Sequence, residues 1–96
     1  MTLLASFVKQ PREKCLVPIN YDKVIAGRVV DSMSLVLEVP AGMSSEGYVI
    51  AGADLLFHAA GGTDQAAYRF TALMTIVIGG FHIVQEDEID FVVTAI

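Results

Sequence analysis

The sequence has no tryptophan and only one cysteine, Cys15. A single cysteine excludes a disulfide within the chain, so packing and hydrogen bonds must hold the fold together. It also fits a protein that folds in a reducing cytoplasm. Cys15 itself is interpreted as a small buried side chain rather than as a nucleophile.

Charged residues make up only 18% of the 96 residues, whereas hydrophobic residues make up 54% and the mean hydropathy is +0.60. A small domain has a large surface for its volume, so this composition predicts that some apolar surface is covered by another chain. The formal net charge of −5 argues against direct binding to nucleic acid, because the phosphate backbone attracts basic surfaces.

Long hydrophobic runs are also missing. The longest, residues 72–83, is shorter than the roughly 20 residues of a membrane-spanning helix and is interrupted by Gly79 and Gly80. The first residues lack the basic segment of a secretory signal, and Lys9 and Pro11 follow before an apolar segment of useful length. We therefore expect neither membrane insertion nor export by a signal peptide.

The residue patterns of common catalytic, metal and cofactor sites are missing as well. His58 and His82 have no potential ligand at metal-binding spacing. Gly61 and Gly62 do not begin a phosphate-binding motif, and no serine lies in a nucleophile elbow. The sequence thus predicts no catalytic residue, no metal and no cofactor.

Glycine and proline divide the chain into short segments typical of β-strands, without a sustained helical period. In residues 32–39 the odd positions are apolar and should face the core. In residues 53–60 the better apolar face is Leu55 and Phe57, and Pro18 restricts its own strand to a sheet edge. Strands are predicted at residues 6–9, 15–19, 32–39, 48–51, 53–60, 67–78 and 81–94.

Two turns are specific enough to predict their geometry. Residues 39–42 suit a type I turn, with proline second and glycine fourth. Gly79 and Gly80 predict a two-residue hairpin, which sets Ile78 opposite Phe81. Counting back from the hairpin gives the pairs Ile76–Ile83, Thr71–Glu88, Phe70–Ile89, Arg69–Asp90 and Tyr68–Phe91. The same register sets Met74 and Ala72 opposite Gln85 and Asp87 on the core face, so we expect a bulge or an exposed edge there.

The segment from Gly61 to Phe70, called the corner below, is the most informative part of the chain. Its elements are Gly61, Gly62, Asp64, Tyr68 and Phe70. In immunoglobulin-like sandwiches a tyrosine at this place turns its hydroxyl back onto the upstream backbone. The sequence therefore predicts a single domain, residues 1–96, with the all-β, immunoglobulin-like antiparallel β-sandwich fold, about seven strands, and residues 1–5 as a candidate disordered segment.

The run from Leu73 to Ile78 is apolar on both faces, so its outer face should be covered too. We expect Leu73, Val77 and Val84 to lie in an oligomer contact. Five of the six basic residues precede Val29, whereas acidic residues gather in residues 86–90. This pattern indicates either solvated faces or head-to-tail pairing of subunits.

From Phe7 onward the chain resembles small phage and prophage proteins of the fiber-tail adaptor type. The matching features are Lys9-Gln10-Pro11, Tyr21-Asp22, the turn at residues 39–43, the corner with Tyr68-Arg69-Phe70-Thr71, and the glycine turn before an acidic last strand. The chain departs from that family in having no tryptophan and no arginine-rich final hairpin. The resemblance implies a compact, oligomeric virion module.

Taken together, we expect a non-enzymatic phage or prophage virion structural protein or tail-fiber adaptor. Its partners would be other virion proteins or its own subunits in a homo-oligomer, in the virion or, during assembly, in the bacterial cytoplasm. The alternative is an immunoglobulin-like module that binds a carbohydrate or protein surface, which would need exposed aromatic residues. An enzyme ranks third and would need a cleft where His58, His82 and carboxylates converge.

Overall fold

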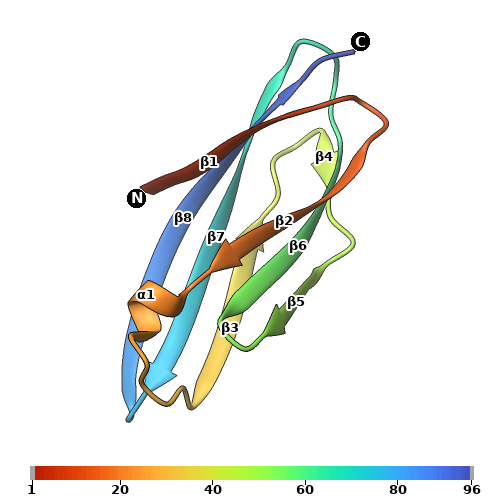
Figure 1. Cartoon of the computed structure of the whole chain (residues 1–96). Helices are drawn as coiled ribbons and strands as arrows, with labels where there is room; N and C mark the ends of the chain where they lie inside the picture. The colour runs from red at the N-terminus through yellow and green to blue at the C-terminus, as the bar shows by residue number, and fades with distance from the viewer. Residues whose placement is uncertain (1, 96) are drawn as a thin grey trace.

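In the computed structural model, two β-sheets pack face to face (Figure 1). It describes residues 2–95, with side chains from Ser6 onward. The first sheet has the strand order β1-β8-β7-β3 and the second β2-β6-β4, with β5 also paired to β6. The strands are β1 (Thr2–Lys9), β2 (Lys14–Asn20), β3 (Ser32–Glu38), β4 (Met43–Ser44), β5 (Tyr48–Ala51), β6 (Asp54–Gly61), β7 (Ala67–Ile78) and β8 (Phe81–Val93), and a short helix α1 (Asp22–Ile25) joins β2 to β3.

The chain crosses between the sheets after β1, β2, β3 and β6, which gives the predicted immunoglobulin-like sandwich. One pairing differs from the expected antiparallel arrangement, because β1 runs parallel to β8. No short loop joins β1 directly to β8, so these two strands can pair in either the parallel or the antiparallel direction. The described residues form eight strands rather than about seven, because a break at residues 45–47 divides one sheet edge into β4 and β5.

The β7–β8 hairpin follows the predicted register along its whole length, including Tyr68 opposite Phe91. Gly79 and Gly80 have φ values of 57° and 83°, as a type I′ turn requires. The expected bulge is wrong, since Gln85 and Asp87 stay in register with β7. The alternative, an exposed edge, is wrong for Asp87, which is buried and paired with β1 as well, whereas half-buried Gln85 lies beyond the last β1 pair. A register shift occurs instead in the β1–β8 pairing, between Leu3 and Ala5.

Three further expectations need correction. The turn after β3 closes one residue later than predicted, with the Met43 N–H donating to the Pro40 carbonyl at 3.2 Å. Gly42 is its third residue and has φ 94°, which fits a type II turn rather than type I. Residues 2–5, expected as a candidate disordered segment, belong to β1, and residue 1 lies outside the described residues. Cys15, expected to be buried, is half-buried on β2.

Alternate residues of the facing strands fill the space between the sheets. Phe57 of β6 and Phe70 of β7 pack across it with ring centroids 5.5 Å apart, and Phe70 meets Phe91 edge-on at 5.4 Å. The odd positions of β3 and β6 face inward as predicted, with Leu35 and Leu55 buried. The core cluster comprises Val17, Ile19, Tyr21, Ile25, Leu35, Leu55, Phe57, Ala59, Phe70, Ala72, Met74, Ile76, Ile89 and Phe91.

Candidate interaction surfaces

The corner has the predicted tyrosine geometry. The Tyr68 hydroxyl accepts a hydrogen bond from the Thr63 N–H at 2.9 Å, and this bond lowers the pKa of the Tyr68 hydroxyl. The Tyr68 ring lies against two glycines, since a Cβ at Gly42 or Gly62 would approach it to 3.0 or 3.3 Å. Glycine is required here because the aromatic ring occupies the space of a side chain.

The other corner residues also have structural roles. The Asp64 carboxylate accepts a hydrogen bond from the Ala95 N–H at 2.7 Å, so it ties the segment after β8 to the corner. Phe70 is fully buried between Phe57 and Phe91. The corner therefore joins the two sheets.

Lys9 was not identified from the sequence, yet it is buried beside the corner. Its Nζ donates to the carbonyl oxygens of Gly61 at 2.6 Å and Gln10 at 2.7 Å, and only 2% of the residue is exposed. The ammonium group thereby links the end of β1 to the end of β6. Nothing local in the sequence indicates this contact, because Gly61 lies 52 residues away.

The acidic residues of β8 do not form the solvated surface expected from the sequence. Asp87 is 3% exposed and accepts a hydrogen bond from the Gln85 amide at 3.2 Å, which explains how β8 stays regular at this position. Glu88 is also buried, and Arg69 donates to its carboxylate at 3.1 Å. Head-to-tail electrostatic pairing through these carboxylates therefore has little support.

Arg69 is held mainly by Asp90, as the predicted register required. Its Nε and Nη2 donate to the two carboxylate oxygens of Asp90 at 2.6 and 3.0 Å. The hydrogen bonds to Asp90 raise the pKa of Arg69, and the same contact lowers the pKa of the Asp90 carboxyl. The one cation and two anions of this cluster therefore find their ion-pair partners within the chain.

The three predicted contact residues lie together on the outer face of the first sheet. Val84 is opposite Thr75, so Leu73 and Val77 are its diagonal neighbours on β7. Val36 of β3 is opposite Leu73 and extends this surface to the sheet edge. Val36 and Val84 are 60% and 58% exposed, whereas Leu73 and Val77 are half-buried. We call Val36, Leu73, Val77 and Val84 the outer patch.

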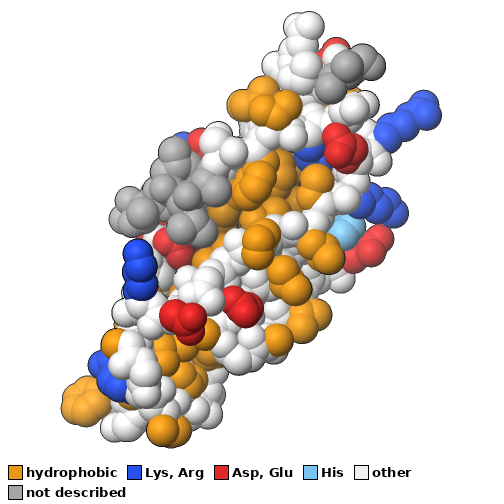
Figure 2. All heavy atoms as spheres, in the orientation of Figure 1, with side chains coloured by type: hydrophobic (Ala, Val, Ile, Leu, Met, Phe, Trp, Pro, Cys, Tyr) orange, Lys and Arg blue, Asp and Glu red, His pale blue; other side chains and the backbone are white. Residues whose placement is uncertain are grey.

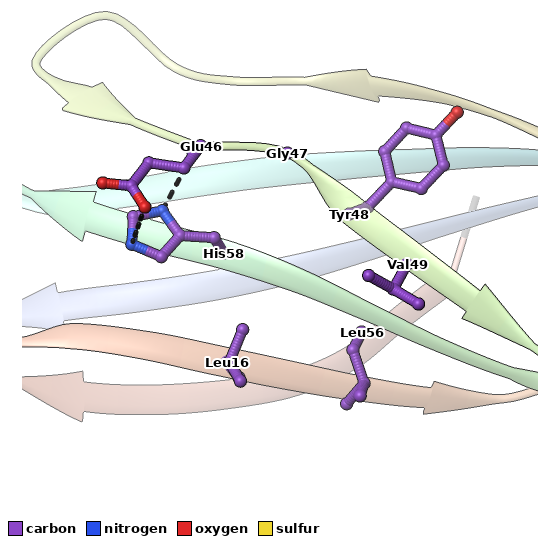
Figure 3. A pocket seen from close by; sticks show the side chains of 7 residues that line it. All are labelled: Leu16, Glu46, Gly47, Tyr48, Val49, Leu56 and His58. Carbon is purple, nitrogen blue, oxygen red and sulfur yellow. Dashed lines mark hydrogen bonds and ion pairs between the residues drawn. The ribbon is translucent and has the colours of Figure 1, made fainter.

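A second apolar surface lies on the opposite side of the molecule. Figure 2 shows hydrophobic side chains gathered over β2, β6 and β5 on this face, with a histidine at their border. They surround an open depression of about 300 Å³, which we call the hollow. The hollow is lined by Leu16, Glu46, Gly47, Tyr48, Val49, Leu56 and His58 (Figure 3).

Three adjacent strands build the hollow. Leu16 of β2 is opposite His58 of β6, and Val49 of β5 is opposite Leu56 of β6. The even positions of β6 thus face outward while Leu55 and Phe57 face the core. The sequence shows both apolar sets on β6, but it does not show that β2 and β5 bring Leu16 and Val49 beside the outer one.

His58 closes one end of the hollow beside Glu46 (Figure 3). Its Nδ1 accepts a hydrogen bond from the Glu46 N–H at 2.9 Å, so the proton of the neutral ring must lie on Nε2. The Nε2 atom is buried without a hydrogen-bond partner among the described residues and lies 3.9 Å from a Glu46 carboxylate oxygen. His58 therefore holds the residues before β5 in place, and its Nε2 atom is buried although part of the ring reaches the surface.

Residues 2–95 contain no group of three or more His, Cys, Asp or Glu side chains arranged to hold a metal ion. No helix in this part of the chain is long and apolar enough to cross a membrane. A comparison with known protein families found no match to the chain, and a comparison with curated proteins found none either.

Proposed function

We propose that the chain is a non-enzymatic structural or tail-fiber adaptor subunit of a phage or prophage particle, which assembles through protein–protein contacts. The observation that carries the proposal is the hollow, an exposed apolar depression built on three paired strands. Exposed apolar surface that is rimmed by polar groups is typical of protein interfaces. The resemblance of the turns and the corner to fiber-tail adaptors supports a place in the virion.

The proposed mechanism is the burial of apolar surface against a partner protein. Leu16 and Val49 are 66% and 61% exposed, so an apolar side chain of a partner could bury both by entering the hollow. Each buried Å² of apolar surface contributes roughly 25 cal/mol before the costs of association. The Lys14–Glu46 ion pair at 3.7 Å lies at one end and supplies the polar rim.

The virion role is tested on particles. Phage particles released from a strain that carries the gene should contain the chain after density-gradient purification, as detected by mass spectrometry. Particles from a strain that lacks the gene should be incomplete at the tail in electron micrographs. If purified particles lack the chain and the deletion leaves tails unchanged, the virion role is wrong.

The hollow is tested with a matched pair of variants. Leu16→Lys places a charge in the hollow and should reduce incorporation into particles, whereas Val29→Lys adds the same charge at an 83% exposed position after α1. Circular dichroism and thermal unfolding should show that both variants fold. Equal incorporation of the two variants would mean that the hollow is not the contact surface.

A second candidate function is binding of a carbohydrate or protein surface, and one observation favours it. Tyr48, 46% exposed, begins the edge strand β5 at the border of the hollow, with its ring turned away from Val49 and Leu56 (Figure 3), and an exposed aromatic ring can stack on a ligand. A glycan array probed with the whole chain tests this function, with Tyr48→Ala as the comparison. Binding that depends on Tyr48, together with absence from particles, would favour this candidate over the virion role.

A further inference from the structure

The edges of the two sheets differ in how they are protected against pairing with another chain. An edge strand presents unpaired N–H and C=O groups, and natural proteins guard such edges with proline, lysine, bulges or short strands. Strands β1, β2, β4 and β5 have such protection. Strand β2 carries Pro18 and begins at Lys14, β4 and β5 have two and four residues, and β1 has a register shift between Leu3 and Ala5.

Strand β3 is unprotected over its whole length, whereas β8 has such a free edge only at residues 81–86, which extend beyond the last pairing with β1. Strand β3 forms one edge of the first sheet, is seven residues long and contains no proline, glycine, lysine or arginine. Its pairing with β7 runs without a shift from Ser32 to Glu38. Its single charge is Glu38, at the last position. A regular, apolar edge of this length is a template for another strand.

We propose that β3 pairs antiparallel with β3 of a second copy of the chain, about a two-fold axis at Leu35. This pairing identifies a second copy of the chain as one partner in the assembly proposed above, and the inference rests on that proposed function. It would join the two first sheets into one continuous sheet of eight strands, a size within the range of natural sheets. A two-fold contact of this kind closes on itself and gives a dimer.

The sequence of β3 is self-complementary in this register. Leu35 would lie opposite Leu35 of the partner subunit, and Met33 opposite Leu37 of the partner subunit. Met33 and Leu37 are half-buried at the edge of the core, so the pairing would complete their burial. On the outer face Ser34 would lie opposite Val36 of the partner subunit. Apolar positions therefore meet on the core face of β3.

Charge favours the antiparallel direction over a parallel one. In a parallel, in-register pair the two Glu38 carboxylates would be neighbours about 5 Å apart, which is unfavourable. In the antiparallel pair they lie six residues apart along the strands, at about 20 Å. Each Glu38 then lies opposite Ser32 of the partner subunit, which carries no charge.

The pairing also covers part of the outer patch. Val36 lies next to the two-fold axis, so the two copies of Val36 become diagonal neighbours at about 7–8 Å. Each Val36 is opposite Leu73 within its own chain. The two outer patches would then form one apolar surface across the dimer, which gives a role to Val36 on the otherwise polar outer face of β3.

The first test compares Ser34→Lys with wild type by analytical ultracentrifugation over a range of concentrations. Wild type should dimerise reversibly, and Ser34→Lys should weaken the dimer by about tenfold or more, because lysine at an edge opposes pairing and the two new charges are diagonal neighbours. His82→Lys, at an exposed position of β8, is the charge-matched control and should dimerise like wild type. A wild type that remains monomeric, or a Ser34→Lys variant that dimerises like the control, would overturn the proposal.

The second test identifies the register. Combining Ser34→Lys with Val36→Glu places the new lysine directly opposite the new glutamate of the partner, twice in each dimer. The double variant should recover most of the dimerisation that Ser34→Lys loses. In a parallel, in-register pair the same double variant would place like charges together, so failure to recover contradicts the antiparallel register. Thermal unfolding of each variant shows that the monomer still folds.

The outcome separates this inference from the proposed function. If wild type stays monomeric in solution and yet enters particles, the β3 pairing is wrong and the virion role stands. If the chain dimerises through β3 but is absent from particles, the pairing stands and the virion role is wrong.

Discussion

The Tyr68 hydroxyl accepts a hydrogen bond from the Thr63 N–H at 2.9 Å, and this contact closes the crossover between the two sheets. It links a strand of the first sheet to the loop that follows β6 of the second. The two glycines against the Tyr68 ring and the Lys9 ammonium add further contacts at the same crossover.

Tyr68→Phe removes the acceptor of the Thr63 N–H and keeps the ring. The free energy of unfolding should fall by a small amount, typical of one lost hydrogen bond, measured by urea denaturation at neutral pH. Tyr48→Phe removes a hydroxyl from an exposed position and is the control. A loss no greater than that of the control would mean that the hydrogen bond does not stabilise the corner.

Gly62→Ala should be much more costly than an ordinary glycine replacement. Gly62 has φ 99°, and a Cβ there would lie 2.6 Å from Val93 Cγ2. Left-handed strain and overpacking together should reduce the free energy of unfolding by about 2–4 kcal/mol. Gly52→Ala is the control, because Gly52 has φ 60° with nothing within 4 Å of its Cβ, so only strain of about 1–2 kcal/mol applies. Equal losses would contradict the close approach to Val93.

Tyr21 should make the fold less stable at high pH. Burial, together with the nearby Asp87 carboxylate, raises the pKa of Tyr21 to about 12 from its usual value of 10.0. Between these values the unfolded chain has lost the phenolic proton while the folded chain keeps it, so folding stability falls as the pH rises. The loss should approach roughly 2–3 kcal/mol at pH 12.

The Tyr21 effect is isolated by comparison with Tyr21→Phe, because both proteins share every other titrating group. Above pH 10 the melting temperature of wild type should fall relative to that of Tyr21→Phe. At neutral pH the variant should keep its stability, since the Tyr21 hydroxyl has no hydrogen-bond partner among residues 2–95. A constant difference in melting temperature from pH 8 to 12 would contradict the raised pKa.

Arg69→Met should reduce stability modestly and in a pH-dependent way. Arg69 is half-exposed, so solvent screens its ion pairs and its loss should cost little stability at neutral pH. Because Arg69 lowers the pKa of Asp90, the ion pair contributes above the usual carboxyl pKa of 3.8 and is lost as the pH falls through the folded value. Unfolding curves of wild type and variant should therefore converge in acid. Gln10→Met, at an exposed position outside the cluster, should leave the pH dependence unchanged.

Much of the local structure was predictable because its causes are local. Gly79 and Gly80 determine the turn type, and a two-residue turn determines the register of the two strands that it joins. The alternation in β3 and β6 predicts which side chains face the core, because successive strand residues point to opposite faces. The corner was recognisable because glycine, aspartate and tyrosine occur there in a fixed order.

The expectations that were wrong or missing depend on individual contacts, most of them between residues that are far apart in the sequence. Asp87 stays in register in the core because the Gln85 amide donates to its carboxylate, so no bulge is needed. Lys9 is buried because the Gly61 carbonyl meets it across the sandwich. The parallel pairing of β1 with β8 joins the two ends of the chain. None of these contacts leaves a periodic signal in the sequence.

The sequence by itself determined the fold class, the hairpin, the corner and the inward faces, because steric limits on glycine and proline and the two-residue period of strands act within a few residues. Only the tertiary structure decided which apolar residues stay exposed together. The hollow needs Leu16, Val49 and Leu56 from three strands, and the free edge of β3 exists because no other strand of the described chain pairs beyond it. Such surfaces depend on strand order, which residues far apart in the sequence set through packing.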